Sequence, residues 1–274
     1  MKKLWVSVDV EPDIAPSESY SGLIQGIPRL LDLFAAASIV ADFFVLGHVT
    51  GRFSETIRQI AARGHALGSH GHHHEYLAPK SAEEQSKDIG ASVEAITLAS
   101  GQTVSMFRAP NFSANGTTVR ILERRGIRCD SSVLPGRVAR KWRLFRVYDH
   151  RLAPRGPYRP SREDIDVPGQ SDVWELPVTE NPLKPGTPLG LGFLNSHTVE
   201  ETIHAAEMSE GDYIAFLIHP WEAVDLPVRE RRLPRWLGTA CQSDLRSLEE
   251  FLRTGKERWG TTTAVDLLSG TRGQ

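Results

Sequence analysis

Residues 4–11, Leu4-Trp5-Val6-Ser7-Val8-Asp9-Val10-Glu11, join an apolar run directly to two carboxylates. Short runs rich in β-branched and aromatic side chains are typical of buried strands. We therefore predict a buried strand over residues 4–8 that ends at the acidic pair. The same pattern, an apolar run followed by polar side chains, recurs along the chain.

Helical and extended patterns alternate after this first strand. Glu84 follows Ser81 by three residues, which is the capping-box signature of a helix start. Such alternation indicates parallel strands joined by crossover helices, an α/β architecture. We expect further strands over residues 40–46, 65–69, 104–107, 127–129, 173–176, 213–218 and 262–265, and helices over residues 26–37, 53–63, 81–100, 115–125, 199–208 and 243–252.

Polar clusters follow several of these strands. In α/β barrels and in open parallel sheets, working residues collect at the carboxyl ends of the strands. The side chains in such positions are therefore expected to share one site. They are Asp9 and Glu11, the histidines at 70–74, Arg108, Glu175 and His219.

Four histidines occupy residues 70–74, with Gly71 between the first and the second. Imidazole is a common metal ligand, and side chains four residues apart on a helical turn point the same way. His70 and His74 have that spacing, and His70 and His73 come close to it. An extended segment would instead align His70, His72 and His74. The spacing alone leaves the ligands open, but an internal run between two patterned segments is unlike a terminal tag.

Composition narrows the class of protein. With 274 residues, 40% of them hydrophobic, the chain can form one substantial core, and we expect a single domain over residues 1–274. A net charge of −2 gives no general attraction for nucleic acid. Cys129 and Cys241 fit buried thiols in a reducing compartment. The start lacks a signal-peptide core, and no apolar run reaches about 18 residues, so we expect a cytoplasmic protein.

Five motifs in this order resemble those of the polysaccharide deacetylase family, also called carbohydrate esterase family 4 or the NodB-homology family. The resemblance spans roughly residues 4–268 and implies a distorted (β/α) barrel of about seven parallel strands. It also implies one divalent metal, usually zinc, and hydrolysis of an N-acyl group, most often acetyl, from an amino sugar. The motifs are Asp9-Val10-Glu11, residues 69–77 (SHGHHHEYL), residues 107–110 (FRAP), residues 174–177 (WELP) and residues 216–222 (FLIHPWE).

The resemblance also implies a role for individual residues. Asp9 resembles the catalytic base, and Arg108 resembles the residue that holds this base. His70 and His74 resemble the metal-binding pair, and His219 resembles the general acid.

The first motif departs from its commonest form, in which two aspartates are adjacent. Val10 stands in the second place here. Residues two apart on a strand share a face, so Glu11 is the natural substitute as metal ligand. Asp13 is a further candidate for this carboxylate.

Amide hydrolysis near neutral pH explains why these residue types would be needed together. A metal with an open position lowers the pKa of water toward about 7. Asp9 would accept the proton, Arg108 would keep Asp9 ionised, and His219 would protonate the leaving amine. We expect the Asn111 backbone N–H to contact the oxyanion. Two further candidates are Trp174 as a substrate platform and Glu175 as a carboxylate that orients His219.

A basic connection near residues 132–172 follows the fifth strand. It contains nine cationic side chains between residues 137 and 162 and one acid, Asp149. Such a loop suits a polyprenyl-phosphate-linked or nucleotide-linked sugar, or peripheral contact with an anionic membrane. A solvated loop is the alternative, and residues 229–232 add a second basic segment. The nine are Arg137, Arg140, Lys141, Arg143, Arg146, Arg151, Arg155, Arg159 and Arg162.

Three functional classes remain from the sequence. The first is a zinc-dependent N-deacetylase acting on an amino sugar in cell-envelope glycan synthesis. The second is an amidohydrolase of the same fold that removes formyl or opens a small cyclic amide or ureide. The third is a sugar-binding protein without catalysis, against which the full set of acid, base and ligand residue types argues. The sugar, its linkage and the oligomeric state are left open.

Overall fold

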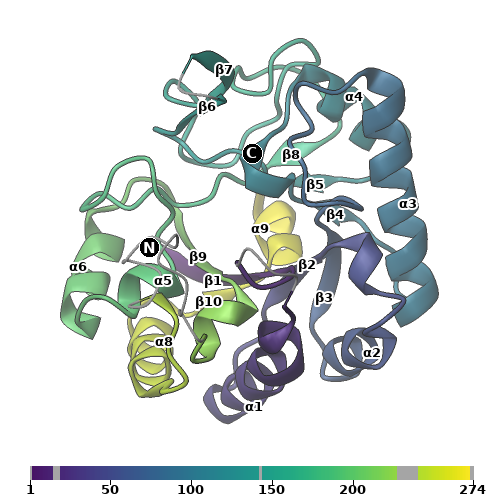
Figure 1. Ribbon diagram of the computed structural model, residues 1–274. Helices are drawn as coiled ribbons and strands as arrows, with labels where there is room; N and C mark the ends of the chain where they lie inside the picture. Colours follow the sequence, from purple (N-terminus) through teal and green to yellow (C-terminus); the bar gives the residue numbers. More distant parts are fainter. Residues whose placement is uncertain (1, 15–18, 142–143, 227–239, 272–274) are drawn as a thin grey trace.

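A computed structural model describes residues 2–14, 19–141, 144–226 and 240–271 (Figure 1). Eight of its strands form one sheet, and every pairing in this sheet is parallel. Seven strands lie side by side in the order β9-β1-β2-β3-β4-β5-β8. The eighth, β10, pairs with Leu4 and Trp5 of β1, while β2 pairs with residues 7–10 of the same strand. The predicted α/β fold with about seven parallel strands is confirmed.

The strands of the sheet are β1 (Lys3–Val10), β2 (Asp42–Val45), β3 (Ala66–Ser69), β4 (Met106–Phe107), β5 (Cys129–Asp130), β8 (Trp174–Glu175), β9 (Tyr213–Ile218) and β10 (Thr261–Thr262). The α-helices are α1 (Ile27–Ala37), α2 (Ser54–Ala62), α3 (Ala82–Ser100), α4 (Gly116–Arg124), α5 (Leu191–Leu194), α6 (Val199–Met208), α8 (Arg246–Trp259) and α9 (Ala264–Thr271). Short helical turns are η1 (Gly22–Gly26), η2 (Gly47–Val49), η3 (Pro110–Phe112) and η4 (Pro220–Ala223).

The sheet curls into a distorted barrel with an irregular segment between β8 and β9. Leu217 of β9 donates its N–H to the Leu189 carbonyl, and the Leu189 N–H donates in turn to the Thr179 carbonyl. The Val178 N–H donates to the Val133 carbonyl. Residues 178–189 therefore lie between β8 and β9, and individual backbone hydrogen bonds join this segment to β9 and to the chain after β5.

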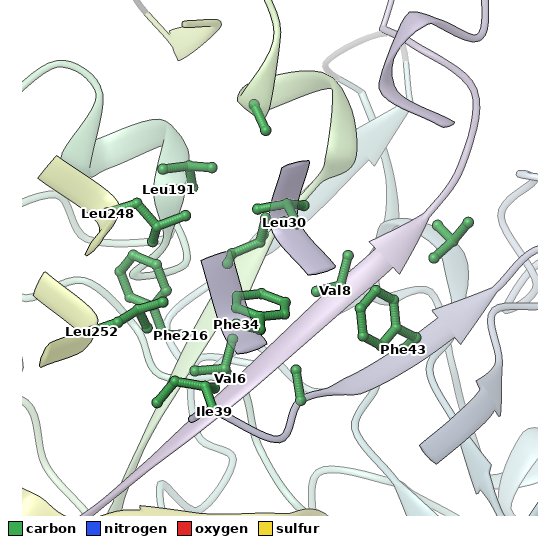
Figure 2. Close-up of a cluster of buried hydrophobic side chains, with 14 of the residues drawn as sticks. Val6, Val8, Leu30, Phe34, Ile39, Phe43, Leu191, Phe216, Leu248 and Leu252 are labelled. Atoms are coloured by element: carbon green, nitrogen blue, oxygen red, sulfur yellow. The ribbon is translucent and has the colours of Figure 1, made fainter. Parts of the chain in front are cut away.

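Side-chain alternation along β1 places its apolar residues in two different clusters of the hydrophobic core. Val6 and Val8 point outward and pack with Phe34 of α1 and Phe216 of β9 under the surrounding helices (Figure 2). Trp5 points inward, into a second cluster that α9 covers with Ala264 and Leu268. Seven of the eight β1 residues are buried, because both faces of the strand are covered. The inward side of β1 then continues to Ser7 and Asp9, and so leads to the polar end of the barrel.

The sequence located most elements within a few residues. The capping box at Ser81 is present: the Ser81 hydroxyl accepts from the Glu84 N–H, and the Glu84 carboxylate accepts from the Ser81 N–H. The expected strand over 262–265 is wrong in its second half, where α9 begins. The Ala264 N–H donates to the buried Asp42 carboxylate at 2.7 Å, which anchors the start of that helix.

The long basic connection contains a hairpin that the sequence did not predict. Its strands, β6 (Val138–Lys141) and β7 (Phe145–Asp149), pair antiparallel and lie apart from the main sheet (Figure 1). Arg143 and residues 229–232, which belong to the two basic segments, lie outside the described residues. None of the helices in the described ranges is both long enough and apolar enough to cross a membrane.

Candidate active site

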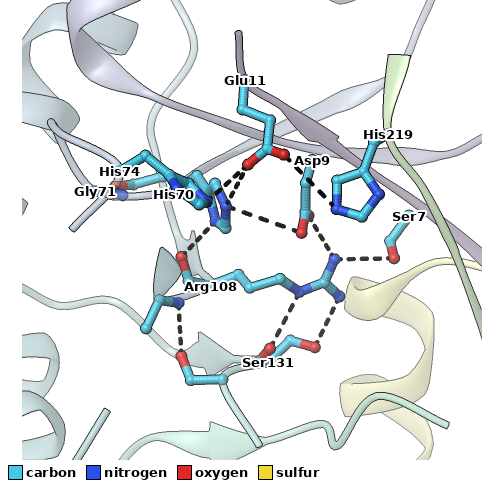
Figure 3. Close-up of polar contacts among 12 residues, drawn as sticks. Ser7, Asp9, Glu11, His70, Gly71, His74, Arg108, Ser131 and His219 are labelled. Atoms are coloured by element: carbon cyan, nitrogen blue, oxygen red, sulfur yellow. Dashed lines mark hydrogen bonds and ion pairs between the residues drawn. The ribbon is translucent and has the colours of Figure 1, made fainter. Parts of the chain in front are cut away.

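One pocket of about 760 Å³ opens where β1, β4 and β9 end. Its walls bring together side chains from positions 9 to 219, far apart in the sequence (Figure 3). The predicted site residues Asp9, Glu11, His70, His74 and His219 all line it. Asn111 lines it as well. Of the other residues expected at the site, Arg108 contacts Asp9 from outside this lining, and Glu175 is not part of it.

Arg108 forms the buried support of Asp9. Its guanidinium is fully buried, and Nη1 donates to Asp9 Oδ1 at 2.7 Å and to the Ser7 hydroxyl at 3.1 Å. Nε and Nη2 donate to the carbonyl and the hydroxyl of Ser131 on the far side. The ring of Phe44 lies 4.2 Å from the guanidinium carbon. With its plane fixed by these contacts, Arg108 orients the Asp9 carboxylate through a charge-assisted hydrogen bond.

The tautomer of His70 follows from its hydrogen bond. Its Nδ1 lies 2.8 Å from the Arg108 carbonyl oxygen. A carbonyl can only accept, so Nδ1 carries the proton and the Nε2 lone pair faces the pocket. This Nε2 lies 3.6 Å from Glu11 Oε2 and 3.9 Å from Asp9 Oδ2. An imidazole so held has the orientation of a metal ligand.

A sharp turn, neither helix nor strand, separates His70 from His74. Gly71 adopts φ +76°, and an added Cβ there would lie 2.9 Å from the Asp88 carboxylate. The same carboxylate accepts from the His72 N–H at 2.8 Å and from the His73 N–H at 3.3 Å. This turn brings the His70 and His74 rings to 5.6 Å between centroids.

His72 and His73 point elsewhere. Their rings pack on each other at 4.6 Å between centroids, and His48 lies beside both. The three histidines form a cluster outside the pocket. Of the alternatives that the spacing left open, the structure brings together His70 and His74 and leaves out the two between them.

Glu11 completes a group that fits a metal ion. One ligand atom each from Glu11, His70 and His74 lie within 4.8 Å of one another. Glu11 Oε2 lies 2.8 Å from His74 Nε2, yet this buried oxygen forms no hydrogen bond of normal geometry. Burial alone would raise the pKa of Glu11, but His70 and His74 lower it well below its usual value. Two imidazoles and an ionised carboxylate are a donor set that suits a divalent cation, and the Glu11 oxygen without a hydrogen bond is available as a ligand atom.

Asp13 binds backbone N–H groups instead of the histidines. Its two carboxylate oxygens accept from the Ser21 and Gly22 N–H groups at 2.7 and 2.8 Å. It therefore fixes the entry to η1, although it also lines the pocket. Of the two carboxylates considered as ligands, Glu11 is the one that the structure places among the histidines.

His219 faces the group from the end of β9, the strand that pairs with β1. Its Nε2 lies 3.9 Å from Glu11 Oε1, and its Nδ1 lies 3.4 Å from Glu222 Oε2. Burial alone would lower the pKa of His219, but the charges of Glu222, Glu11 and Asp9 raise it to about 9. The imidazole is therefore protonated at neutral pH while no cation is nearby, and a bound cation would act in the opposite direction.

Two neighbours of His219 belong to the site, although no separate role was predicted for them. The Trp221 indole N–H donates to Glu11 Oε1 at 3.1 Å, and its ring stacks on His219. The Glu222 carboxylate accepts the His219 backbone N–H at 2.8 Å. The three-residue spacing of His219 and Glu222, typical of a helix cap, was the available signal.

Asn111 lies at the pocket wall with backbone φ +54°, in the left-handed region. The Tyr148 hydroxyl donates to the Asn111 carbonyl at 2.6 Å. This bond comes from the unpredicted hairpin and fixes the conformation of the loop after Pro110.

Trp174 and Glu175 are not placed at the pocket, and this corrects the expectation from the WELP motif. The side chain of Trp174 packs on the inner apolar cluster, and the Arg159 guanidinium lies 5.3 Å from its ring. Glu175 is fully buried and accepts from the Val133 N–H at 3.0 Å. The carboxylate beside His219 is therefore Glu222, and Glu175 does not orient this histidine.

Glu175 instead forms a buried carboxyl pair with Asp130 on the neighbouring strand β5. Burial raises the pKa of Asp130 to about 7 and the pKa of Glu175 well above its usual value. The Ser132 hydroxyl donates to Asp130 and accepts the Ala109 N–H at 2.8 Å. Through Ser132, Asp130 thus holds the backbone at Ala109, the residue that follows Arg108.

The raised pKa of Asp130 predicts that the stability of the folded protein depends on pH. Between about pH 4 and pH 7 the folded protein keeps a proton on Asp130 that the unfolded chain has lost. The free energy of unfolding should therefore fall as the pH rises, by roughly 1 kcal/mol per pH unit from this group. Asp130→Asn should reduce that slope in urea unfolding measured from pH 5 to pH 8. Equal slopes for the variant and the parent would contradict the raised pKa.

The fold and the site define a class: α/β barrel proteins in which strand ends gather three imidazoles and two carboxylates, Asp9 and Glu11, in one pocket, with a buried arginine bound to Asp9. Residues 13–129 match the family model described as polysaccharide deacetylase. A peptidoglycan deacetylase from Helicobacter pylori is 32% identical over 123 residues, which are 45% of this chain and 42% of that protein. The chain thus spans less than half the length of this curated relative.

Solved structures extend the likeness to nearly the whole chain. A provisionally assigned polysaccharide deacetylase from Mycobacterium smegmatis superposes with a TM-score of 0.63 at 20% identity, covering 92% of this chain and 79% of that one. A family 4 carbohydrate esterase pseudoenzyme from Bacillus anthracis gives 0.56 at 13% identity, with coverages of 97% and 66%. At these identities the superpositions show the fold. The family match over residues 13–129 and these superpositions make the chain similar to polysaccharide deacetylases in sequence over that range and in fold over most of its length.

Proposed function

We propose that this protein is a metal-dependent hydrolase that removes an N-acetyl group from an amino sugar. The observation that supports this most directly is the gathering of Asp9, His219 and the Glu11, His70, His74 group in one pocket. The relative from Helicobacter pylori is named a peptidoglycan deacetylase, which is consistent with an acetylated amino-sugar substrate. The family fold alone would not suffice, since one structural neighbour is described as a pseudoenzyme.

The proposal assigns the cation to Glu11, His70 and His74. Zinc is the ion we propose, because two imidazole nitrogens and one carboxylate with an open position are typical of catalytic zinc sites. A divalent cation in this place would polarise the acetamide carbonyl and lower the pKa of water. The Trp221 N–H, bound to Glu11 Oε1, would hold the carboxylate of the ligand in its orientation.

Asp9 is proposed as the general base. Its Oδ1 is occupied by Arg108, whereas Oδ2 faces His70 at 3.9 Å on the pocket side. A water molecule in the pocket could therefore give its proton to Oδ2 as its oxygen attacks the carbonyl carbon. Arg108 touches no substrate in this scheme and acts by holding the base.

His219 is proposed as the general acid. Its Nε2 lies 3.9 Å from Glu11 Oε1, whereas His70 and His74 lie beside Oε2. As imidazolium, His219 would donate the Nε2 proton to the amine nitrogen while the C–N bond breaks. The products are acetate and the free amino sugar. The N–H of Asn111, in the loop that Tyr148 fixes, is proposed to contact the oxyanion that forms on the carbonyl.

A phosphate-linked substrate and peripheral membrane contact are the finer parts of the proposal. The hairpin presents Leu144 and Phe145, 77% and 63% exposed, next to Arg146. Exposed apolar side chains beside cations suit the surface of an anionic bilayer. A protein bound in this way to the cytoplasmic face of the membrane would have access to a polyprenyl-phosphate-linked sugar.

Acetate release tests the proposal. Purified protein, analysed for bound metal and reloaded with zinc after chelation, should release acetate from N-acetylglucosamine oligomers, and the chelated protein should not. Faster release of formate from an N-formyl sugar, or opening of a ureide, would favour the related amidohydrolase activity. Sugar binding without turnover by the zinc-loaded protein would overturn the proposal in favour of a binding protein.

A further inference from the structure

Only one of the described cations from the basic connection lines the pocket, and it is Arg137. A second cation, Lys184, comes from a different loop that the sequence did not single out. An added Cβ on Gly186 would lie 3.8 Å from the Gly136 carbonyl oxygen, so the loops that carry the two cations are in contact. Two positive charges therefore belong to one wall of the pocket.

Four other cations of the connection form ion pairs with acids that do not line the pocket. Arg146 and Arg151 pair with Asp149, and Arg155 pairs with Glu180. Arg162 binds Glu123 through two hydrogen bonds. By contrast, none of the ion pairs within the described part of the chain includes Arg137 or Lys184.

The pocket's acids already have partners. Asp9 binds Arg108, Glu11 lies among the histidines, and Asp13 accepts two backbone N–H groups. Glu222 accepts the His219 backbone N–H and lies beside its ring. The charges of Arg137 and Lys184 are thus not matched by the carboxylates that line the same pocket.

Arg137 is held in place by a hydrogen bond from Nε, and neither of its Nη groups forms a hydrogen bond or ion pair with another described residue. Nε donates to the Tyr148 hydroxyl at 3.0 Å, and the guanidinium carbon lies 5.7 Å from the Phe112 ring. Tyr148 in turn donates to the Asn111 carbonyl, next to the proposed oxyanion contact. A guanidinium anchored through Nε and an apolar ring can still offer its Nη groups to a carboxylate or phosphate.

We propose that Arg137 and Lys184 form an anion subsite that binds a carboxylate or phosphate substituent of the substrate. This inference rests on the proposed function, because the anion would be carried by the amino sugar that is deacetylated or by a unit bonded to it. Apolar side chains of Phe112, Phe193 and Leu217 line the same pocket and lower the local dielectric. The subsite would select anionic amino sugars over neutral ones with the same acetamide.

Binding and turnover of three matched sugars test the subsite. N-acetylglucosamine is neutral, N-acetylmuramic acid adds a carboxylate, and N-acetylglucosamine 1-phosphate adds a phosphate. We expect the zinc-loaded protein to bind at least one anionic sugar about tenfold more tightly than the neutral one, and Arg137→Met or Lys184→Met to abolish most of that preference. The arm that shows the preference identifies the anion. Arg253→Met, which removes an exposed cation of α8 that pairs with Glu257 and does not line the pocket, is the matched control.

Binding and turnover separate the two proposals. Anion-dependent binding that is lost in both variants, without acetate release, would support the subsite and contradict the deacetylase. Acetate release with equal binding of neutral and anionic sugars would overturn the subsite and leave the deacetylase in place. A loss of preference in Arg253→Met equal to that in Arg137→Met would show a general charge effect and would also overturn the subsite.

Discussion

Asp9→Asn is expected to bind zinc as the parent does and to lose acetate release by about 10²–10⁴-fold, the usual contribution of a general base. The substituted amide can still accept the Arg108 hydrogen bond through its oxygen, so the shape of the site should be retained. It cannot take a proton from water. Rates from N-acetylglucosamine oligomers, with metal content measured on the same samples, check this expectation.

The kinetic constants make the Asp9 prediction specific. The loss should lie in kcat, with KM nearly unchanged, since a base acts in the transition state and not in substrate binding. Glu250→Gln, a substitution in helix α8 far from the pocket lining, is a suitable control for the removal of one carboxylate. Near-parental turnover by Asp9→Asn would exclude Asp9 as the base.

The order of motifs located the site better than any single motif did. Each inward side chain at a strand end is separated from the others by a crossover helix, so hydrophobic periodicity was enough to predict that Asp9, Arg108 and His219 meet. Their hydrogen bonds could not be predicted in the same way. The support of Arg108 by Ser131 depends on how β4 and β5 are aligned, which no local pattern encodes.

The misplacement of Glu175 has a simple geometric cause. Neighbouring residues in extended chain face opposite sides, and Trp174 of β8 and Leu176 just after it both face the inner cluster. Glu175 between them must face the other way, where it meets Asp130 of β5. The choice of which residue faces inward in a strand of two residues could not be made from its sequence.

The histidine run shows a similar limit. Helical and extended spacing gave different ligand sets, and the chain adopts neither conformation between His70 and His74. The turn depends on Gly71 in the left-handed region and on Asp88, 17 residues later, which accepts the two following N–H groups. A contact between a turn and a distant helix lies outside what spacing can predict.

His74→Ala should lower zinc affinity by more than about 100-fold, the upper range seen when only a supporting partner of a ligand is removed. His74 Nε2 lies 2.8 Å from Glu11 Oε2, so the substitution deletes one of three ligand groups and leaves two. The side chain is 36% exposed, and its truncation should therefore leave the fold intact. Competition with a chromogenic chelator measures the affinity, and circular dichroism verifies the fold.

His73→Ala is the matched control, because it changes the adjacent residue, and the His73 ring packs against His48 and His72. It should keep zinc and activity close to the parental values. His72→Ala should do the same, since its ring lies in the same outer cluster. A zinc affinity that falls equally in His73→Ala and His74→Ala would place the ion among the outer histidines. Loss of zinc in His72→Ala as well as in His74→Ala would favour the alternate spacing of an extended segment, which aligns His70, His72 and His74.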